Sequence, residues 1–389
     1  MVWHRLAELP GPCADAASAG HWESRGMTSS FGPGGQTASS SASPSVLVIG
    51  ATGYIGSRLV PALLAAGVEV SVLARNPHKL DGVPWSARVS VHEGGLGDDA
   101  ELTAAMGGKD VVCHLVHSMG TSDDFEREER RTAETFVRAA EMAGVGRIVH
   151  LSGLHPDRDD DLSPHLRSRV EVGRILLDST VPALVLQAGV VVGSGSASFE
   201  MIRHLTTRLP AMITPKWVHN RIQPIAIRDV VHYLVAASTC ETDGARTIDV
   251  GGPDVLEYGE MMQQYAEEAG LHRRISVPVP LLTPRLSSLW VKLVTPLPGD
   301  LAAPLVESLR CEAIVSRDDA DELLGPPPGG RTGYREAVRE ALRVPIGKGR
   351  PARWEDSDPV ADPAVQIPTD ADWAGVRPPT IWRAASGAR

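Results

Sequence analysis

The stretch VLVIGATGYIG at residues 46–56 decides the fold expected of this chain. Four apolar residues lead it, and the β-branched ones among them are typical of a buried strand. Gly50, Gly53 and Gly56 follow at three-residue spacing, and residues 57–66 have mostly helical composition. A second apolar run at 68–73 then predicts a strand, a glycine turn, a helix and a strand, which together form one βαβ unit.

Each glycine of this unit has a distinct physical role. Gly50 allows a tight turn, Gly53 lets the backbone approach a pyrophosphate, and Gly56 lets the helix pack close to its strand. The N-terminus of the following helix offers N–H groups and a partial positive charge to phosphates. The pattern therefore predicts a dinucleotide-binding turn, and the alternative is a structural turn without a ligand.

Composition narrows the class of protein. The 389 residues, 42% of them hydrophobic, can build a sizeable core, and the net charge of −10 argues against nucleic acid as the main partner. The four cysteines are far apart and form no CxxC pattern, so neither a zinc knuckle nor a disulfide framework is indicated. No signal peptide or membrane-spanning stretch is recognisable, which is typical of a cytoplasmic protein.

The tip of the second strand bears on the choice of cofactor. A site that prefers NAD usually places an acid here, about twenty residues beyond the glycines, to bind the ribose 2′-hydroxyl. This chain has Arg75 instead, and an arginine can pair with a 2′-phosphate. The alternative is a solvated surface arginine.

Further strands and helices alternate along the chain. We expect strands near 89–92, 111–116, 147–151, 182–192 and 247–250, separated by helices that include 100–106, 163–178 and 229–237. A helix over 258–269 and another near 305–315 would belong to a smaller lobe. The predicted fold class is α/β, a doubly wound and mainly parallel Rossmann sheet with a small C-terminal substrate lobe.

The two ends of the chain differ in composition from the middle. Residues 1–44 read as a disordered segment, in which Met27 is an alternative start, and residues 344–389 read as a Pro-rich tail whose tryptophans could dock on a domain. The NAD(P)-binding domain is expected over 45–343, with its lobe at about 194–217 and 251–343. Within it, 279–297 reads as a lid, a dimer contact or a membrane-facing surface, and a substrate-covering segment fits its prolines best.

Several motifs resemble one known group of proteins. They are GATGYIG at 50–56, LVHSM at 115–119, SPHLRSR at 163–169, QPIAIRD at 223–229 and GGP at 251–253. Together they resemble the atypical short-chain dehydrogenase/reductase superfamily, and within it the NmrA-like NAD(P)H-binding group, over about residues 45–343. The resemblance implies that the cofactor is contacted by Gly50, Thr52, Gly53, Tyr54, Ile55, Gly56, Arg75, Leu96, Leu115, Val116 and His117.

The chain departs from that family at its catalytic pair. Active members of the superfamily use a Tyr-x-x-x-Lys pair and a serine. Here Ser152 matches the serine, but the pair is His165 and Arg169. A histidine can carry a proton near neutral pH, and an arginine can hold a ribose hydroxyl without losing its own proton. Alternatively, this is an exposed polar helix face without a catalytic role. At Gly95, relatives often carry an aspartate near the adenine.

Two functions from different classes follow. The first is an oxidoreductase that prefers NADP(H), with NAD(H) possible, and reduces a small carbonyl-like substrate. In it His165 would donate the proton, Arg169 would hold the ribose and Ser152 would bind the developing oxyanion. The second is a non-catalytic NADP(H)-binding redox sensor or scaffold protein. No metal is expected, because His114 and His117 point to opposite faces of a strand end.

Overall fold

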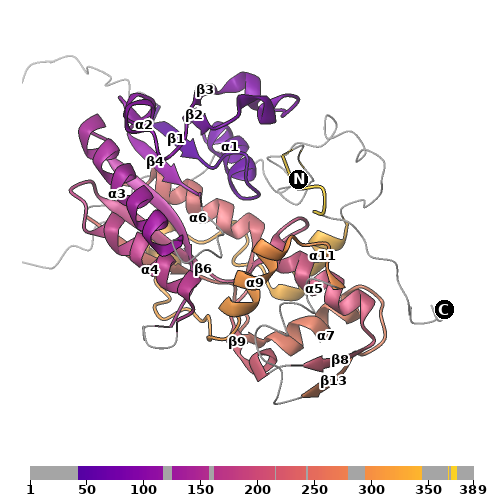
Figure 1. The fold of residues 1–389 in the computed structure, drawn as a ribbon. Helices are drawn as coiled ribbons and strands as arrows, with labels where there is room; N and C mark the ends of the chain where they lie inside the picture. Colours follow the sequence, from indigo (N-terminus) through magenta and orange to yellow (C-terminus); the bar gives the residue numbers. More distant parts are fainter. Residues whose placement is uncertain are drawn as a thin grey trace, which may run out of the picture.

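The computed structural model describes residues 43–116, 125–156, 162–214, 216–241, 244–278, 294–343, 367 and 369–374. A seven-stranded sheet with helices on both faces lies beside a smaller lobe (Figure 1). The strand order is β11-β6-β5-β4-β1-β2-β3, and neighbouring strands run parallel throughout. The doubly wound parallel fold predicted from the sequence is thereby confirmed.

The strands of this sheet are short and mostly buried. They are β1 (Ser45–Ile49), β2 (Glu69–Ala74), β3 (Ser90–Glu93), β4 (Val111–His114), β5 (Arg147–Gly153), β6 (Ala183–Ala188) and β11 (Arg246–Val250). Because the chain returns through helices after most of them, their carboxyl ends meet at one edge of the sheet.

Alternate residues of β1 face two separate apolar cores. Val46 and Val48 pack with α1 (Gly56–Ala65) and α6 (Ile227–Thr239) on one face of the sheet. Leu47 and Ile49 pack on the opposite face, with α2, α3 and α4. Those three helices span Asp99–Met106, Phe125–Ala143 and Pro164–Leu177. Burial on both faces explains why β1 is a continuous apolar run without polar alternation.

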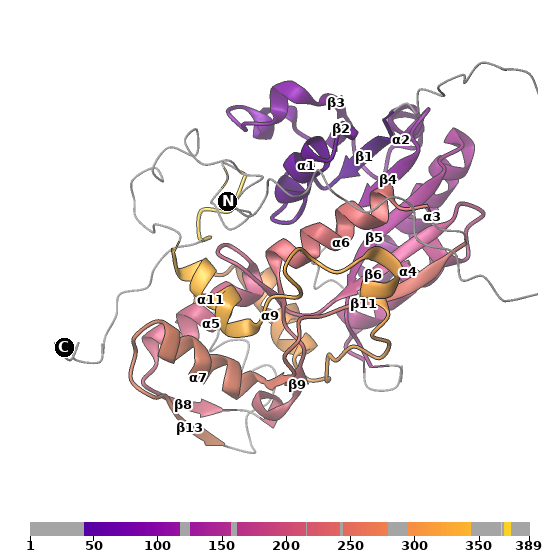
Figure 2. The ribbon, with the colours of Figure 1, turned by 180° about the vertical axis from the view of Figure 1, so that it is seen from behind.

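The smaller lobe has its own core, which is built mainly from helices. They are α5 (Ala197–Arg208), α7 (Tyr258–Glu268), α9 (Gly299–Ser308) and α11 (Tyr334–Arg343). Three short strand pairs accompany them: β7 (Val191–Val192) with β10 (Ile225–Ala226), β9 (Arg221–Ile222) with β12 (Leu256–Glu257), and β8 (Ala211–Thr214) with β13 (Ile275–Pro278). The lobe lies to one side of the sheet, seen from behind in Figure 2, and α10 (Ala320–Leu324) packs on the core of α1 and α6.

Two elements differ from their predicted bounds. The strand expected over 182–192 is divided into β6 and β7, because at Gly189 the chain passes against Gln223: a Cβ on Gly189 would lie 1.8 Å from that carbonyl oxygen. The helix expected near 305–315 begins earlier, after Pro298, and ends at Ser308. Beyond it the backbone N–H of Ala313 bonds to Arg221, so the chain is extended there rather than helical.

None of the helices in the described ranges combines the length and the apolar composition that a membrane crossing requires.

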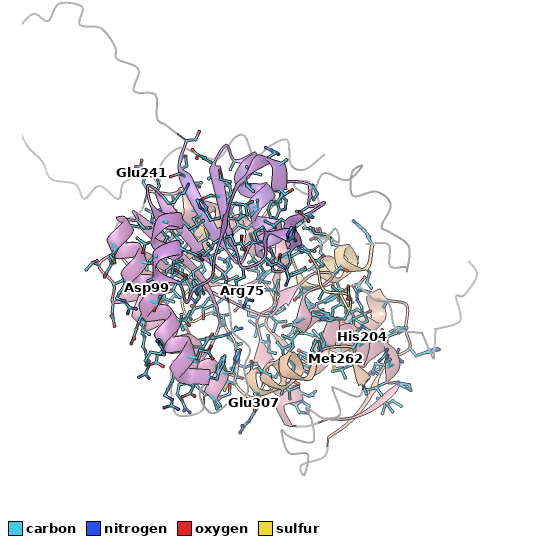
Figure 3. All side chains as sticks on the ribbon, turned by 45° about the horizontal axis from the view of Figure 1, so that its top comes forward. Arg75, Asp99, His204, Glu241, Met262 and Glu307 are labelled. Carbon is cyan, nitrogen blue, oxygen red and sulfur yellow. The ribbon has the colours of Figure 1, made fainter. Side chains whose placement is uncertain are left out.

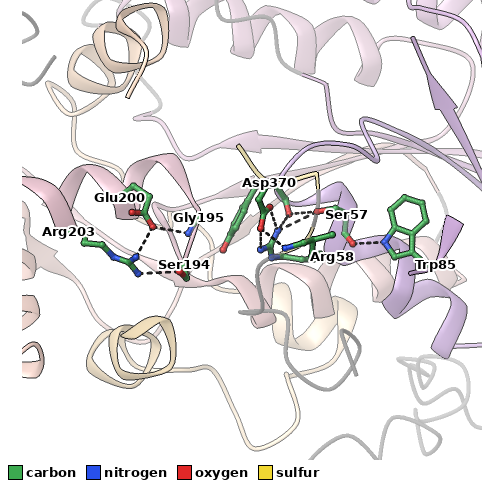
Figure 4. Close-up of polar contacts among 10 residues, drawn as sticks. Ser57, Arg58, Trp85, Ser194, Gly195, Glu200, Arg203 and Asp370 are labelled. Carbon is green, nitrogen blue, oxygen red and sulfur yellow. Dashed lines mark hydrogen bonds and ion pairs between the residues drawn. The ribbon is translucent and has the colours of Figure 1, made fainter. Parts of the chain in front are cut away.

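A segment of the predicted tail, residues 367 and 369–374, docks on the domain and touches both cores. Ile367 belongs to the core of α1 and α6, whereas Trp373 packs against the core of the lobe. Between them Asp370 meets Arg58 of α1 (Figure 4). We call residues 367 and 369–374 the strap, because they connect helix α1 with the lobe.

Arg58 forms a buried ion pair with the strap. Its two terminal nitrogens donate to the two oxygens of Asp370, each at 2.8 Å, and the side chains are 0% and 2% exposed. The guanidinium also donates to the Tyr54 carbonyl at 2.8 Å and lies 4.0 Å from the centre of the Tyr54 ring. A bidentate pair fixes geometry as well as charge, so the strap holds the first turns of α1 in a defined position.

We expect Asp370→Asn to destabilise the protein strongly. The substitution leaves the Arg58 charge buried without its counter-charge, and breaking such a pair costs about 3–5 kcal/mol. Urea unfolding followed by circular dichroism measures the change. Asp372→Asn is the matched control, because Asp372 is an exposed residue of the same strap. Equal midpoints for the two variants would contradict a structural role for the pair.

Candidate active site

The glycine turn after β1 has room for backbone only. Gly50 has a φ of 98°, which favours glycine, and a Cβ there would lie 3.0 Å from the Leu115 carbonyl carbon. At Gly56 a Cβ would lie 2.2 Å from the Gly50 carbonyl oxygen, so helix α1 starts in direct contact with the turn. Two of the three roles expected from the sequence therefore follow from the packing itself.

Gly53 differs from these two glycines. It is exposed, and a Cβ on it would meet only the Gly50 carbonyl oxygen, at 3.2 Å. Its N–H donates to that oxygen at 2.9 Å, so the turn is closed from inside and its outer surface is left to solvent. A Cβ on Gly53 would thus be tight against one carbonyl oxygen but would not overlap it as a Cβ on Gly56 would, and the exposed side of the turn is open to a ligand.

The N-terminus of α1 fits a dinucleotide pyrophosphate. The described first turn of α1 holds no acidic side chain, and the Ile55 N-cap makes no side-chain hydrogen bond to it. The N–H groups of Ser57, Arg58 and Leu59 already bond to the Gly53 and Ile55 carbonyls, so this helix end forms an anion cradle through its partial positive charge and the exposed Gly53 backbone. The nearby carboxylate of Asp370 is neutralised by Arg58. The residues present thus suit an NAD(P)H pyrophosphate.

Tyr54 faces away from this cradle. A Cβ placed on Gly193 would lie 2.3 Å from the Tyr54 hydroxyl oxygen, and one on Gly195 would lie 3.3 Å from the ring. Burial raises the pKa of the hydroxyl. The Tyr54 side chain therefore joins the turn to the loop before α5, and only its backbone can serve the cofactor. Thr52 is half-buried, and Ile55 packs against the core of α1 and α6.

The remaining expected cofactor residues follow the ends of β2, β3 and β4. Arg75 is exposed after β2 and forms no ion pair with a described residue; Figure 3 shows it near the centre of the view, apart from Asp99 of α2. A Cβ on Gly95 would lie 3.5 Å from the Arg75 Cγ atom, so the missing aspartate leaves room beside this arginine. Leu115 and Val116 follow β4, and Leu96 shares a small cavity with Val116. His117 lies outside the described residues.

His165 is buried near the start of α4. Ser163 caps this helix by accepting from the Leu166 N–H at 3.2 Å, and Pro164 opens it. The His165 ring stacks on Phe125 of α3, with 6.1 Å between centroids. Burial, and then the nearby Arg169 charge, lower the pKa of His165 to about 3. The ring is consequently neutral near pH 7, so the proton-donor role predicted for His165 would depend on its single ring N–H.

Arg169 lies one turn further along α4, beside the end of β5. A Cβ on Gly153 would be 3.2 Å from an Arg169 terminal nitrogen, which places the guanidinium next to Ser152 and Gly153. Burial lowers the Arg169 pKa, while Glu129 of α3 raises it. Arginine stays charged despite this, so the side chain supplies a fixed cation at the carboxyl end of β5.

A cavity of about 520 Å³ opens from Ser152 and Arg169 toward the edge strand β11. It lies between α4 and strands β6 and β11, and it also contacts His155, Gln187, Asp249 and Arg317. None of these four residues was predicted from the sequence as part of a site. One signal was present: Gln187 is a polar residue inside the otherwise apolar strand ALVLQA. Its amide lies 2.9 Å from the Nε2 atom of His155.

Two further histidines form a buried pair on neighbouring strands. His114 of β4 and His150 of β5 stand in register, and their Nδ1 atoms are 2.9 Å apart. Burial lowers the pKa of His150 to about 4, and burial together with His150 lowers that of His114 further. The pair is therefore neutral near pH 7 and lines a small cavity that Arg169 also touches.

Comparison with known proteins agrees with this geometry. A family model described as NAD(P)H-binding matches residues 50–185, from the glycine turn to β6. The match begins at the glycine turn of the first βαβ unit and ends within β6, so it covers the part of the chain that carries this turn.

The chain is similar to several enzymes. It is 27% identical over 337 residues to dTDP-6-deoxy-L-talose 4-dehydrogenase (NAD(P)(+)) of Kitasatospora kifunensis, a match that covers 78% of this chain and 96% of the relative. The triphenylmethane reductase of Citrobacter sp., solved with NADP(H), superposes with a TM-score of 0.61 at 18% identity, over 76% of this chain and all of the reductase. The NADPH complex of the Escherichia coli quinone oxidoreductase QOR2 gives 0.60 at 19% identity, over 76% and 99%.

We expect Gly53→Ala to lose cofactor affinity and Gly56→Ala to lose stability. The Cβ on Gly53 stands on the outer surface of the turn, so the variant should fold normally and bind NADPH at least about tenfold more weakly, which is about 1.4 kcal/mol. The Cβ on Gly56 would collide with backbone, so that variant should lose stability first. Melting temperature and NADPH affinity, measured on both purified variants, separate the cases. Wild-type binding by a folded Gly53→Ala protein would show that the turn holds no phosphate.

The low pKa of His165 predicts a pH effect on stability. Its pKa is depressed in the folded state, so as pH falls below about 6.5 the unfolded chain takes up the proton first. The stabilisation is complete above that pH and is lost as pH falls toward 3. We expect His165→Gln to flatten the dependence of unfolding free energy on pH between 6 and 4 by up to about 1.4 kcal/mol per pH unit.

Urea titrations at several pH values measure this slope. His78→Gln serves as the control, because the His78 side chain is 89% exposed. An unchanged slope in His165→Gln would mean that the ring titrates normally in the folded protein.

Proposed function

We propose that this protein is an NADP(H)-dependent oxidoreductase, of the NmrA-like group, that reduces a small carbonyl-like electrophile. The observation that carries the proposal is the cavity that begins at Ser152 and Arg169, at the same sheet edge as the glycine turn. Ligands of doubly wound sheets bind at this edge, outside the carboxyl ends of the strands. An NADP(H)-binding reductase and an NADPH-dependent quinone oxidoreductase share the fold.

In this proposal, different residues of the site bind different parts of the cofactor. The turn at Gly50, Gly53 and Gly56 would hold the pyrophosphate, Arg75 the 2′-phosphate and Arg169 a ribose hydroxyl. A bound nicotinamide would supply the hydride. Ser152, buried at the end of β5, would donate a hydrogen bond to the substrate oxygen as it gains charge.

The proton supply limits the class of electrophile. His165 is neutral and packed on Phe125. The Nδ1 atom of His155 lies 3.1 Å from the Pro156 carbonyl and its Nε2 atom faces Gln187, so this ring has partners on both sides. Since neither of these two described histidines is poised as a strong acid, we expect the substrate to stabilise the negative charge that hydride transfer creates. We therefore expect a conjugated carbonyl, such as a quinone, to react better than a simple aldehyde, with solvent supplying the proton.

The experiment is NADPH oxidation followed at 340 nm with quinones, conjugated ketones, simple aldehydes and a nucleotide sugar. Turnover with the conjugated compounds, at least about tenfold slower in Ser152→Ala at equal NADPH affinity, would support the proposal. If His165→Gln turns over at the wild-type rate, solvent is supported as the proton source. Loss of turnover in this variant would support His165 as the acid.

The non-catalytic alternative rests on the same buried histidine. Replacement of the Tyr-x-x-x-Lys pair by a neutral histidine and an arginine removes the usual proton donor, which a redox sensor or scaffold would not need. Tight NADPH binding with no turnover across the panel would favour this second function.

We expect the site to prefer NADPH over NADH because of Arg75. This exposed guanidinium can pair with the 2′-phosphate, and no described carboxylate competes for it. Arg75→Ala should weaken NADPH binding by about tenfold, or about 1.4 kcal/mol, and leave NADH binding unchanged. Fluorescence titration with both cofactors measures the ratio, with Arg88→Ala as an exposed arginine control. Equal affinities of the wild-type protein for the two cofactors would refute the preference.

A further inference from the structure

The cavity beyond Ser152 is lined by an unusual set of charges. Four arginines contribute to its wall, Arg169 and Arg174 from α4, Arg246 from β11, and Arg317 from the loop before α10. Asp249 is the only acidic side chain that this part of the described structure adds to the lining. The wall is therefore strongly positive, although the whole chain carries a net charge of −10.

Asp249 does not neutralise the arginine side chains. Its Oδ2 atom accepts the backbone N–H of Ser316 at 2.8 Å and that of Arg317 at 3.4 Å. The carboxylate thereby anchors the loop on which Arg317 stands, at the mouth of the cavity. Asp249 is itself nearly buried, at 8% exposed, so its charge serves this anchoring contact.

Two of the arginines keep their charge available. Arg246 and Arg317 are exposed, and neither forms an ion pair with a residue in the described ranges. At the inner end, the Arg169 Nε atom is buried without a hydrogen-bond partner among the described groups. A buried donor without an acceptor is destabilising, and a ligand oxygen would supply the missing acceptor. Guanidinium groups are the preferred protein partners of carboxylate and phosphate groups.

From this geometry we propose that the cavity binds a small molecule with an oxyanion group, a carboxylate or a phosphate, held by Arg246 and Arg317. The cavity volume of about 520 Å³ suits a small-molecule ligand. The inference rests on the proposed function in one respect: it makes this ligand the substrate, with its reducible carbon toward Ser152 and its anionic group toward β11. The edge strand would thus select the anionic group of the substrate, whereas the proton supply limits its reducible group.

The test measures binding directly, so that it does not depend on turnover. The protein is saturated with NADP⁺ to fill the glycine turn, and inorganic pyrophosphate and succinate are titrated separately by calorimetry at low ionic strength. We expect saturable binding of at least one anion, weakened at least tenfold in the Arg246→Ala/Arg317→Ala double variant and weakened by added salt. The two titrants distinguish a phosphate from a carboxylate ligand.

Controls separate the local effect from a general one. Arg273→Ala removes an exposed arginine of the lobe and should bind the anion as the wild-type protein does. The double lysine variant, Arg246→Lys/Arg317→Lys, keeps the charge and should recover part of the affinity, which excludes misfolding as the cause.

The inference is overturned if the wild-type protein binds neither anion saturably, or if the double alanine variant binds with unchanged affinity. Failure of the proposed function looks different, because it would show as absent NADPH binding or absent hydride transfer while the anion titration remains informative.

Discussion

The contact between Gly56 and the carbonyl of Gly50 is the constraint on which the rest of this structure depends. A side chain at the start of α1 would place its Cβ 2.2 Å from that oxygen, so the helix can approach the strand only because Gly56 lacks one. The approach aims the helix N-terminus at the carboxyl edge of the sheet, where the neighbouring strands also end. The anion cradle thus results from backbone packing and does not require any polar side chain at the turn.

Two side chains next to this turn connect it to the lobe and the strap. Tyr54 packs against Gly193 and Gly195 before α5, and Arg58 forms an ion pair with Asp370 of the strap. The same guanidinium lies over the Tyr54 ring, so the turn, the lobe and the strap share one buried cluster. Nearby, Glu200 accepts the Gly195 N–H and pairs with Arg203, which continues the polar contacts into α5 (Figure 4). A shift of the lobe would therefore also displace the N-terminal turns of α1.

The chemistry of the site follows from where charge is buried and where it is left accessible. The His165 ring is buried against Phe125 and is neutral near pH 7. Arg169 stays charged beside β5 and lines the cavity that begins at Ser152. This distribution favours binding of negative groups, from the cofactor phosphates to a substrate oxyanion, over the delivery of protons. It gives a physical reason why a chain with the superfamily fold could retain hydride chemistry while lacking the usual tyrosine.

The sequence by itself determined the features that depend on local patterns. The apolar run of β1, the glycine spacing, the capped start of α4 and the alternation of strands and helices predict the parallel sheet, because backbone conformation and burial periodicity are written in neighbouring residues. The tertiary structure alone decided the features that join distant segments. Arg58 and Asp370 are separated by 312 positions, and the arginine cavity draws on α4, β6, β11 and the loop before α10. The spacing of residues along the chain does not predict these long-range contacts, because they form only when the sheet edge and the lobe pack together. For the same reason, the low pKa of His165 depends mainly on its burial beside Phe125 of α3, which the pattern of its own helix did not reveal; only the smaller effect of Arg169 comes from the same helix.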